Sequence, residues 1–173
     1  MNASFIMRFK AFIIDYILKL VYLILLFILS LFVFPSLQEL FTGSVLVAQF
    51  TGFLMVTLPV SLYYIISDSV IGGQSFGKKK IGIRVVDKNG NYLSLPHVTL
   101  RTILKFFPWE LSHFLVYRLI YLGSEDVPLD YYLIGGLIYI LLFAYIFTAI
   151  FTKRKQSIYD ILAKTQVINV SSN

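Results

Sequence analysis

Residues 8–20 read RFKAFIIDYILKL, and they open the first long apolar run of the chain with an aspartate, Asp15, inside it. Arg8 lies seven residues before Asp15 and Lys19 lies four after it, so all three fall near one face of a helix. A carboxylate in a membrane helix costs roughly 2.5–3.5 kcal/mol on insertion scales unless protein, a cation or water compensates it. We therefore expect the groups that compensate the Asp15 carboxylate to lie close to the functional site.

The composition is that of an integral membrane protein. The chain has 173 residues, the length of one ordinary domain, and we expect residues 1–173 to form a single membrane domain. It is 58% hydrophobic and 14% charged, whereas soluble domains have roughly 45–50% and 25%. The absence of cysteine excludes disulfides and thiolate metal sites. In a membrane chain the net charge of +6 indicates basic cytoplasmic loops rather than a nucleic-acid partner.

Four stretches are long enough to cross a hydrocarbon core, which needs about 20 residues. The third is unusually polar, and a soluble amphipathic helix or a helix lying on the membrane surface would have the same pattern. We expect a true but polar crossing there. The predicted helices cover about residues 12–34, 44–66, 102–122 and 131–151.

The distribution of basic residues predicts the topology. Lys and Arg precede the first stretch, fill the loop 67–101 and follow the fourth stretch, whereas the other two loops have acidic residues and no base. The positive-inside rule then places both termini and the loop 67–101 in the cytoplasm. The sequence predicts an all-α, four-transmembrane-helix bundle that spans the cell inner (plasma) membrane several times.

The loop between the second and third helices has the pattern of a small cytoplasmic β-element. Residues 81–86 have strand character, Asn89-Gly90 suits a type I′ turn, and residues 91–95 could return as the second strand of a β-hairpin. Residues 165–170 alternate and are rich in β-branched side chains, so the tail could add a further strand. We expect this element to cap the helix bundle.

The predicted topology also brings charged residues together near the inner edge of the membrane. One interpretation is a buried ion pair between Arg8 and Asp15 that fixes helix register. The other is a cation or proton site, because an intramembrane carboxylate is both a ligand and a titratable group. Which of these residues touch is left open by the sequence. The candidate cluster is Arg8, Asp15, Asp68, Arg101 and Asp160.

Two further sets of residues could carry function. Lys78, Lys79 and Lys80 could bind anionic lipid head groups or could simply lie in a solvated turn, and the segment lacks phosphate-loop spacing. Glu110 and His113 are three residues apart, so they could share a helix face for proton relay or for hydrogen bonding within the bundle. A single Glu-x-x-His motif is too little for a metal centre, and we expect no cofactor.

The order of these features resembles the RDD family of small bacterial membrane proteins, which is named for one arginine and two aspartates. The resemblance implies that Arg8, Asp15 and Asp160 are the name-giving residues, and Lys164 departs from the glycine usual before the following threonine. Some members have been linked to sodium/proton exchange, and most have no established activity. The matching segments, which span nearly the whole chain, are residues 8–15 (RFKAFIID), 73–78 (GQSFGK), 81–87 (IGIRVVD) and 157–165 (SIYDILAKT).

Three functions are therefore compatible with the sequence, and an enzyme is not expected among them. The first is transport of a monovalent cation or proton by an oligomer, with Asp15 as the ligand. The second is a non-transporting membrane scaffold or regulatory partner protein, and the third is an anionic-lipid-binding protein. The expected partners are the bilayer with anionic lipids on its cytoplasmic side, further copies of the chain in a homo-oligomer, and another membrane protein.

Overall fold

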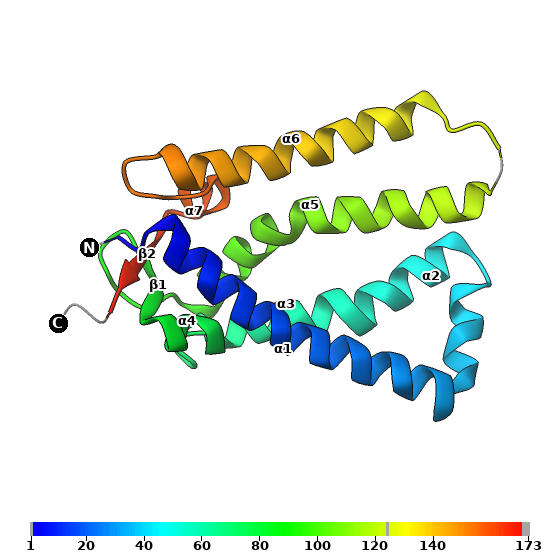
Figure 1. Cartoon of the computed structure of the whole chain (residues 1–173), viewed down its shortest axis with the longest axis horizontal. Coiled ribbons are helices and arrows are strands. Elements are labelled where there is room, and N and C mark those ends of the chain that lie inside the picture. Colours follow the sequence, from blue (N-terminus) through cyan, green and yellow to red (C-terminus); the bar gives the residue numbers. More distant parts are fainter. Residues whose placement is uncertain (1, 124, 171–173) are drawn as a thin grey trace.

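The computed structural model describes residues 2–123 and 125–170. The long helical segments run roughly along the longest axis of the molecule, while the strands and the short helices at residues 76–81 and 158–162 gather at one end (Figure 1). The elements in chain order are α1 (Phe5–Phe32), the 3-10 helix η1 (Pro35–Phe41), α2 (Val45–Gly52), the π-helical turn η2 (Phe53–Thr57), α3 (Leu58–Ser67), α4 (Phe76–Ile81), β1 (Ile83–Asp87), α5 (Leu95–Leu122), α6 (Leu129–Phe151), α7 (Ile158–Leu162) and β2 (Thr165–Asn169).

Three of the long helical segments are long and apolar enough to cross a membrane. They are α1, the continuous segment Val45–Ser67 that joins α2, η2 and α3, and α6. The helix α5 has the length but carries too many polar residues to belong to that set. It nevertheless runs beside α6 and beside the end of α2 in Figure 1. The prediction of a mainly helical membrane protein is confirmed, and the polar third helix exists as a continuous helix.

Two helices extend beyond the predicted membrane stretches. The first predicted stretch starts near residue 12, but α1 begins at Phe5, where the apolar character of the sequence also begins, and the Ser4 hydroxyl accepts a hydrogen bond from the Met7 amide (3.3 Å). Such a cap satisfies an amide that has no partner within the helix. The third predicted helix started at residue 102, but α5 begins at Leu95 with a proline in its first turn. Both extensions carry charged residues beyond the apolar stretches.

The predicted β-hairpin is wrong. Strand β1 pairs in antiparallel fashion with β2 from the C-terminal tail, and Val85 lies opposite Val167. A turn does follow β1, in which the amides of Asn89 and Asn91 donate to the Asp87 carboxylate at 2.8 and 2.9 Å. It is not the predicted type I′ turn, because Gly90 has a positive φ but Asn89 does not. Residues 91–95 then contribute a single bridge, between Leu93 and Ser69, instead of a return strand. The tail provides the better partner because Val85 and Val167 are both buried in the core.

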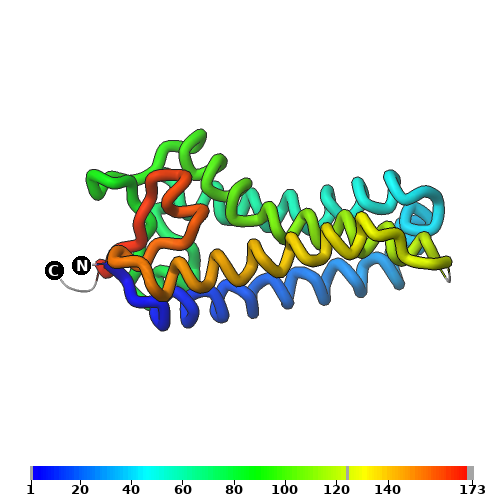
Figure 2. The backbone as a smooth tube through the Cα atoms, turned by 90° about the horizontal axis from the view of Figure 1, so that it is seen from above, coloured from blue at the N-terminus to red at the C-terminus, as the bar shows by residue number. Residues whose placement is uncertain are grey.

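The hydrophobic core lies at the end that carries α4, α7, β1 and β2, which we call the capped end. Both termini reach this end (Figures 1 and 2). The Ala3 amide donates a hydrogen bond to the Val167 carbonyl (2.8 Å), so the first residues join the tail of the chain. The buried core residues are Ala3, Ala11, Ile83, Val85, Leu93, Val98 and Val167.

Replacing Gly77 with alanine should weaken the contact of α4 with α1. A Cβ at Gly77 would overlap the Ala11 carbonyl oxygen and would lie 2.9 Å from Cγ of Asp15. Overpacking of this kind typically costs about 1–3 kcal/mol, so the melting temperature in detergent should fall by several degrees, measured by circular dichroism. Gly136→Ala in α6 is the matched control because open space surrounds that glycine. An equal fall in melting temperature in both variants would contradict this account of the α1–α4 contact.

Candidate functional site

Six charged side chains form one continuous layer at the capped end, contributed by α1, α4, α5, α7 and the residue that follows α3. They alternate in sign along a chain of contacts, and we call them the charged layer. All five residues of the predicted cluster belong to it, and Lys78 is the sixth. In order of contact they are Arg8, Asp160, Arg101, Asp68, Lys78 and, through the Ser75 hydroxyl, Asp15.

Asp15 is buried, with 2% of its surface exposed, and is compensated by hydrogen bonds rather than by an ion pair. Its Oδ1 accepts from the Gly77 amide (2.7 Å) and from the Tyr63 hydroxyl (2.9 Å). Its Oδ2 accepts from the Ser75 hydroxyl (2.7 Å). The ion pair between Arg8 and Asp15, one of the two interpretations of the sequence, is not formed, and Arg8 contacts Asp160 instead. The carboxylate of Asp15 therefore holds the start of α4 against α1.

The local sequence around α4 makes this contact feasible. Ser75 adopts an extended conformation immediately before the helix, and Gly82 ends the helix with a positive φ of 75°. Gly77 lies where α4 meets the backbone of α1, and only a residue without a Cβ fits there. The backbone amide of Gly77 can then approach the Asp15 carboxylate, which is the geometry that an ionised carboxylate favours.

Asp160 accepts hydrogen bonds from two arginines of distant helices. Nη1 of Arg8 lies 2.9 Å from Oδ2, and Nη2 of Arg101 lies 2.8 Å from Oδ1. The Thr165 hydroxyl also donates to Oδ1, at 3.1 Å. Although burial acts to raise the pKa of Asp160, the positive charges of Arg101 and Arg8 bring that pKa below the ordinary aspartate value. The carboxylate is thus ionised and joins α1, α5 and α7.

Asp68 continues the layer on the side of α3. Both of its oxygens accept from Nζ of Lys78, at 2.8 and 2.7 Å, and Nη1 of Arg101 lies 3.7 Å from Oδ2. Burial acts to raise the pKa of Asp68, but the Lys78 ammonium and the Arg101 guanidinium lower it further than burial raises it. Arg101 is therefore shared by two carboxylates and connects them.

Lys78 is the residue of this layer that the sequence reasoning placed wrongly. It was grouped with Lys79 and Lys80 as a lipid contact, but it is buried and paired with Asp68, while the other two are exposed. Helix geometry contained a signal, because three consecutive residues on an α-helix point in directions about 100° apart. On a short helix packed against α1, one of the three lysines had to face the protein.

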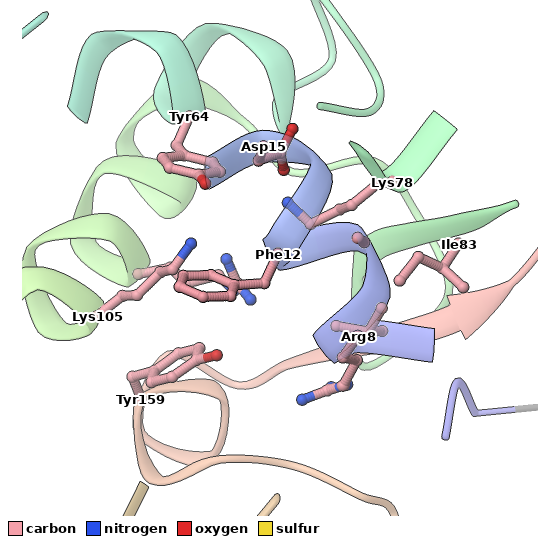
Figure 3. Close-up of a pocket in the computed structure, with 11 residues that line it drawn as sticks. Arg8, Phe12, Asp15, Tyr64, Lys78, Ile83, Lys105 and Tyr159 are labelled. Carbon is pink, nitrogen blue, oxygen red and sulfur yellow. The ribbon is translucent and has the colours of Figure 1, made fainter. Parts of the chain in front are cut away.

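A cavity of about 90 Å³ adjoins the charged layer. Arg8, Lys78 and Lys105 all line it, with Phe12 of α1 among them (Figure 3). Lys105, which the sequence reasoning did not select, places Nζ 3.7 Å from the ring centroid of Tyr64. An ammonium over an aromatic face is attracted by the quadrupole of the ring. The cavity is therefore bordered mainly by cations and aromatic rings.

The second predicted pair, Glu110 and His113, does share a face of α5. Nδ1 of His113 lies 3.3 Å from Oε1 of Glu110, and the Thr57 hydroxyl donates to the same oxygen at 2.5 Å. Thr57 is the last residue of the π-helical turn η2, so this contact joins the second helical segment to α5. The three residues form a polar connection within the bundle, separate from the charged layer.

The described residues include no group of three or more histidine, aspartate or glutamate side chains arranged to hold a metal ion. The carboxylates of the charged layer face arginine, lysine, hydroxyl and amide donors instead. The arrangement can hold helices together, and it can present positive charge to the adjoining cavity.

Replacing Asp160 with asparagine should strongly destabilise the protein at neutral pH. The change leaves Arg8 and Arg101 buried without their shared anion, and removal of one partner of a buried pair typically costs about 3–5 kcal/mol. We expect a large fall in the melting temperature of the purified protein in detergent. Asp126→Asn, in the exposed loop before α6, should leave the melting temperature near that of the wild type.

The difference between wild type and Asp160→Asn should shrink in acid. Because the folded-state pKa of Asp160 is lowered, its stabilising contribution is complete above the unfolded value of about 3.9 and disappears as pH falls through the folded pKa. The two melting temperatures should therefore converge below pH 4. A constant difference down to pH 2 would show that Asp160 is not an ionised partner of the arginines.

Comparisons with known proteins agree with these features. The family model described as the RDD family matches residues 2–164 of the 173-residue chain, which includes the whole charged layer. A search of curated proteins and a search of solved structures gave no match. The family match spans all four long helical segments together with α4, β1 and α7. The chain therefore belongs to the RDD family.

Proposed function

We propose that this protein is a non-transporting scaffold or regulatory partner in the cell inner (plasma) membrane. In this proposal the charged layer is structural, and it holds a cytoplasmic cap of α4, α7, β1 and β2 on four membrane-crossing helices. The function of the protein is then to present that cap, and the lipid-facing helices beneath it, to other membrane components. Two arguments support the proposal. One is the topology, and the other is that protein donors already occupy the buried carboxylates.

The proposed topology adds α5 to the three apolar segments, which gives four membrane crossings. Both termini lie at the capped end, so an even number of crossings is needed to return the chain there (Figure 1). The exposed lysines of α4 lie at that end, whereas Glu125 and Asp126 lie in the loop between α5 and α6. Basic residues favour the cytoplasmic side, which supports a cytoplasmic capped end and an external acidic loop.

Single cysteines test this topology directly, because the chain contains no native cysteine. We expect Asp126→Cys to react with a membrane-impermeant maleimide in intact cells, and Lys79→Cys to react only after the membrane is permeabilised. Both positions are exposed, so a lack of labelling reports on the side of the membrane. Labelling of both residues only after permeabilisation would mean that α5 does not cross, and labelling of Lys79→Cys from outside would reverse the orientation.

The observation that carries the scaffold proposal is that protein donors already occupy all three buried carboxylates. Asp15 accepts from Tyr63, Ser75 and Gly77, and the other two aspartates are bound by arginine or lysine. A sodium ion or proton would have to displace one of these donors. Leaving a buried cation unpaired is strongly unfavourable, which supports a fixed structural layer over an ion-binding site that empties and fills.

Exposed surfaces on the cap and the helices are compatible with partners. Lys79 and Lys80 project from α4 at the proposed level of anionic head groups, which attract basic side chains near a membrane surface. The helices α1 and α6 expose apolar side chains along their length. In a membrane these surfaces contact lipid, further copies of the chain in a homo-oligomer, or the helices of another protein.

Transport of a monovalent cation or proton is the second candidate, and one observation favours it. Asp15, although hydrogen-bonded, also lines the cavity at the charged layer. A carboxylate beside a cavity is where a transported cation would bind. In this alternative the subunits of an oligomer complete the path, because four helices are few for an alternating-access pathway.

Ion flux into proteoliposomes distinguishes the two candidates. Wild-type protein would be reconstituted with a pH-sensitive dye inside and challenged with sodium, potassium and pH gradients. We expect flux at the level of protein-free liposomes, because the carboxylates are occupied by fixed donors. Flux well above that level would contradict the scaffold proposal.

Asp15→Asn and Asp126→Asn provide the matched variants for this assay. If the wild type transports, loss of flux in Asp15→Asn alone would assign the ion path to the charged layer. Flux unchanged in both variants would place the path elsewhere. Gel filtration of each variant before reconstitution separates loss of transport from loss of the folded state.

A further inference from the structure

The charged layer leaves several cationic donors without partners beside the cavity. Nη1 of Arg8 bonds Asp160, but Nε and Nη2 of the same guanidinium are buried and have no hydrogen-bond partner. The Lys105 ammonium contacts the Tyr64 ring and forms no hydrogen bond or ion pair with any described residue. Both residues line the cavity. Buried donors are normally satisfied, so the two free nitrogens of Arg8 lack an acceptor, and the partly buried Lys105 ammonium lies beside the same cavity.

The local charge balance indicates that the missing acceptor is an anion. Within the charged layer the three carboxylates are matched by Arg8, Arg101 and Lys78. Lys105 adds a further basic side chain at the cavity. Lys19 lies on the same face of α1 as Phe12, with its Nζ 5.0 Å from the ring centroid of Phe12, and it lines the space next to the cavity. An anion in the cavity would therefore complement a positive excess that no described carboxylate neutralises.

The size of the cavity fits one small oxyanion. Its volume of about 90 Å³ leaves room for a group of the size of phosphate. The several acceptor oxygens of a phosphate suit the planar donor fork of arginine together with a lysine ammonium.

An apolar groove continues from this cavity along α1. It has a volume of about 150 Å³ and lies between α1, the second helical segment and α5. Phe12 lines both spaces, so they adjoin each other. Most of the side chains that border the groove are apolar or aromatic, and Lys19 and Thr57 are the polar exceptions. The apolar and aromatic ones include Tyr16, Leu23, Val60, Phe106 and Trp109. A ligand that fills both spaces has a phosphate at one end and a hydrocarbon chain at the other.

We propose that the cavity and groove together bind one anionic phospholipid. Its phosphate contacts the free donors of Arg8 and the Lys105 ammonium, and one acyl chain lies along α1 past Phe12. This site differs from a lipid contact by the surface lysines of α4, because Lys105 and Arg8 are partly buried and line a cavity of the bundle. It goes beyond the scaffold function and does not depend on whether ions are transported.

The test measures lipid binding to the full-length protein purified in mild detergent. Phosphatidic acid, phosphatidylglycerol and phosphatidylcholine are titrated separately, and binding is followed by native mass spectrometry and by the melting temperature. We expect each anionic lipid to bind at least about tenfold more tightly than phosphatidylcholine, the difference typical of charge-assisted contacts. Inorganic phosphate, titrated in parallel, distinguishes a lipid from a free anion.

Lys105→Gln is the informative variant because Lys105 has no carboxylate partner that its removal would leave unpaired. The lipid-free variant should be at least as stable as the wild type, while its preference for anionic lipid should fall to within about twofold. Lys105→Arg keeps the charge and should retain the preference. Lys88→Gln, an exposed lysine in the turn after β1, is the matched control and should behave as the wild type.

Three results would overturn the proposal. The first is an equal affinity of the wild type for all three lipids. The second is an anionic preference that survives in Lys105→Gln but disappears in the double variant Lys79→Gln/Lys80→Gln, which would assign binding to the surface of α4. The third is stabilisation by inorganic phosphate equal to that by the lipids. None of these results depends on ion flux, so failure here leaves the scaffold proposal intact.

Discussion

The burial of three carboxylates at one end of a membrane bundle constrains the rest of this structure. Removing a carboxylate from water costs several kcal/mol, so Asp15, Asp68 and Asp160 must each meet donors before the helices can pack around them. Those donors come from α1, α3, α4 and α5, which therefore converge on this level. Away from it α1 contributes few residues to the interior, since only 6% of its most apolar stretch is buried within the protein. The charged layer, rather than the apolar packing of the long helices, fixes the arrangement at the capped end.

The sequence was sufficient to predict which residues gather but not which residues touch. Charges that flank predicted membrane crossings on one side must lie at one level, and that constraint alone selected Arg8, Asp15, Asp68, Arg101 and Asp160. The pairing was misjudged because Arg8 and Asp15 share a helix face. Seven residues along a helix correspond to about 10 Å, so each side chain found a closer partner on another element. Such partners depend on tertiary geometry that a helical pattern does not contain.

The same distinction applies to the β-element. A turn at Asn89-Gly90 was correctly predicted because its chemistry is local, although its type was not, and the strand character of Ile83–Asp87 was also correct. Its partner was not the next segment but the tail, since burial of Val85 against Val167 outweighed proximity along the chain. Lys105 was missed for a similar reason. Its proposed role depends on the lack of a hydrogen-bond acceptor for Lys105 among the described residues. A single sequence contains no signal for such a gap in the tertiary structure.

The closure of the capped end by the tail has a consequence for how the protein is made. Arg8 and Arg101 leave the ribosome before Asp160, their shared partner, and β1 is synthesised long before β2. A growing chain that has not yet reached residue 160 therefore holds two arginines and one strand edge without their final contacts. Residues 160–169 supply these contacts within one short stretch, and Val167 in the same stretch also accepts from the Ala3 amide. A chain that stops before this stretch lacks both the anion that Arg8 and Arg101 share and the partner of β1.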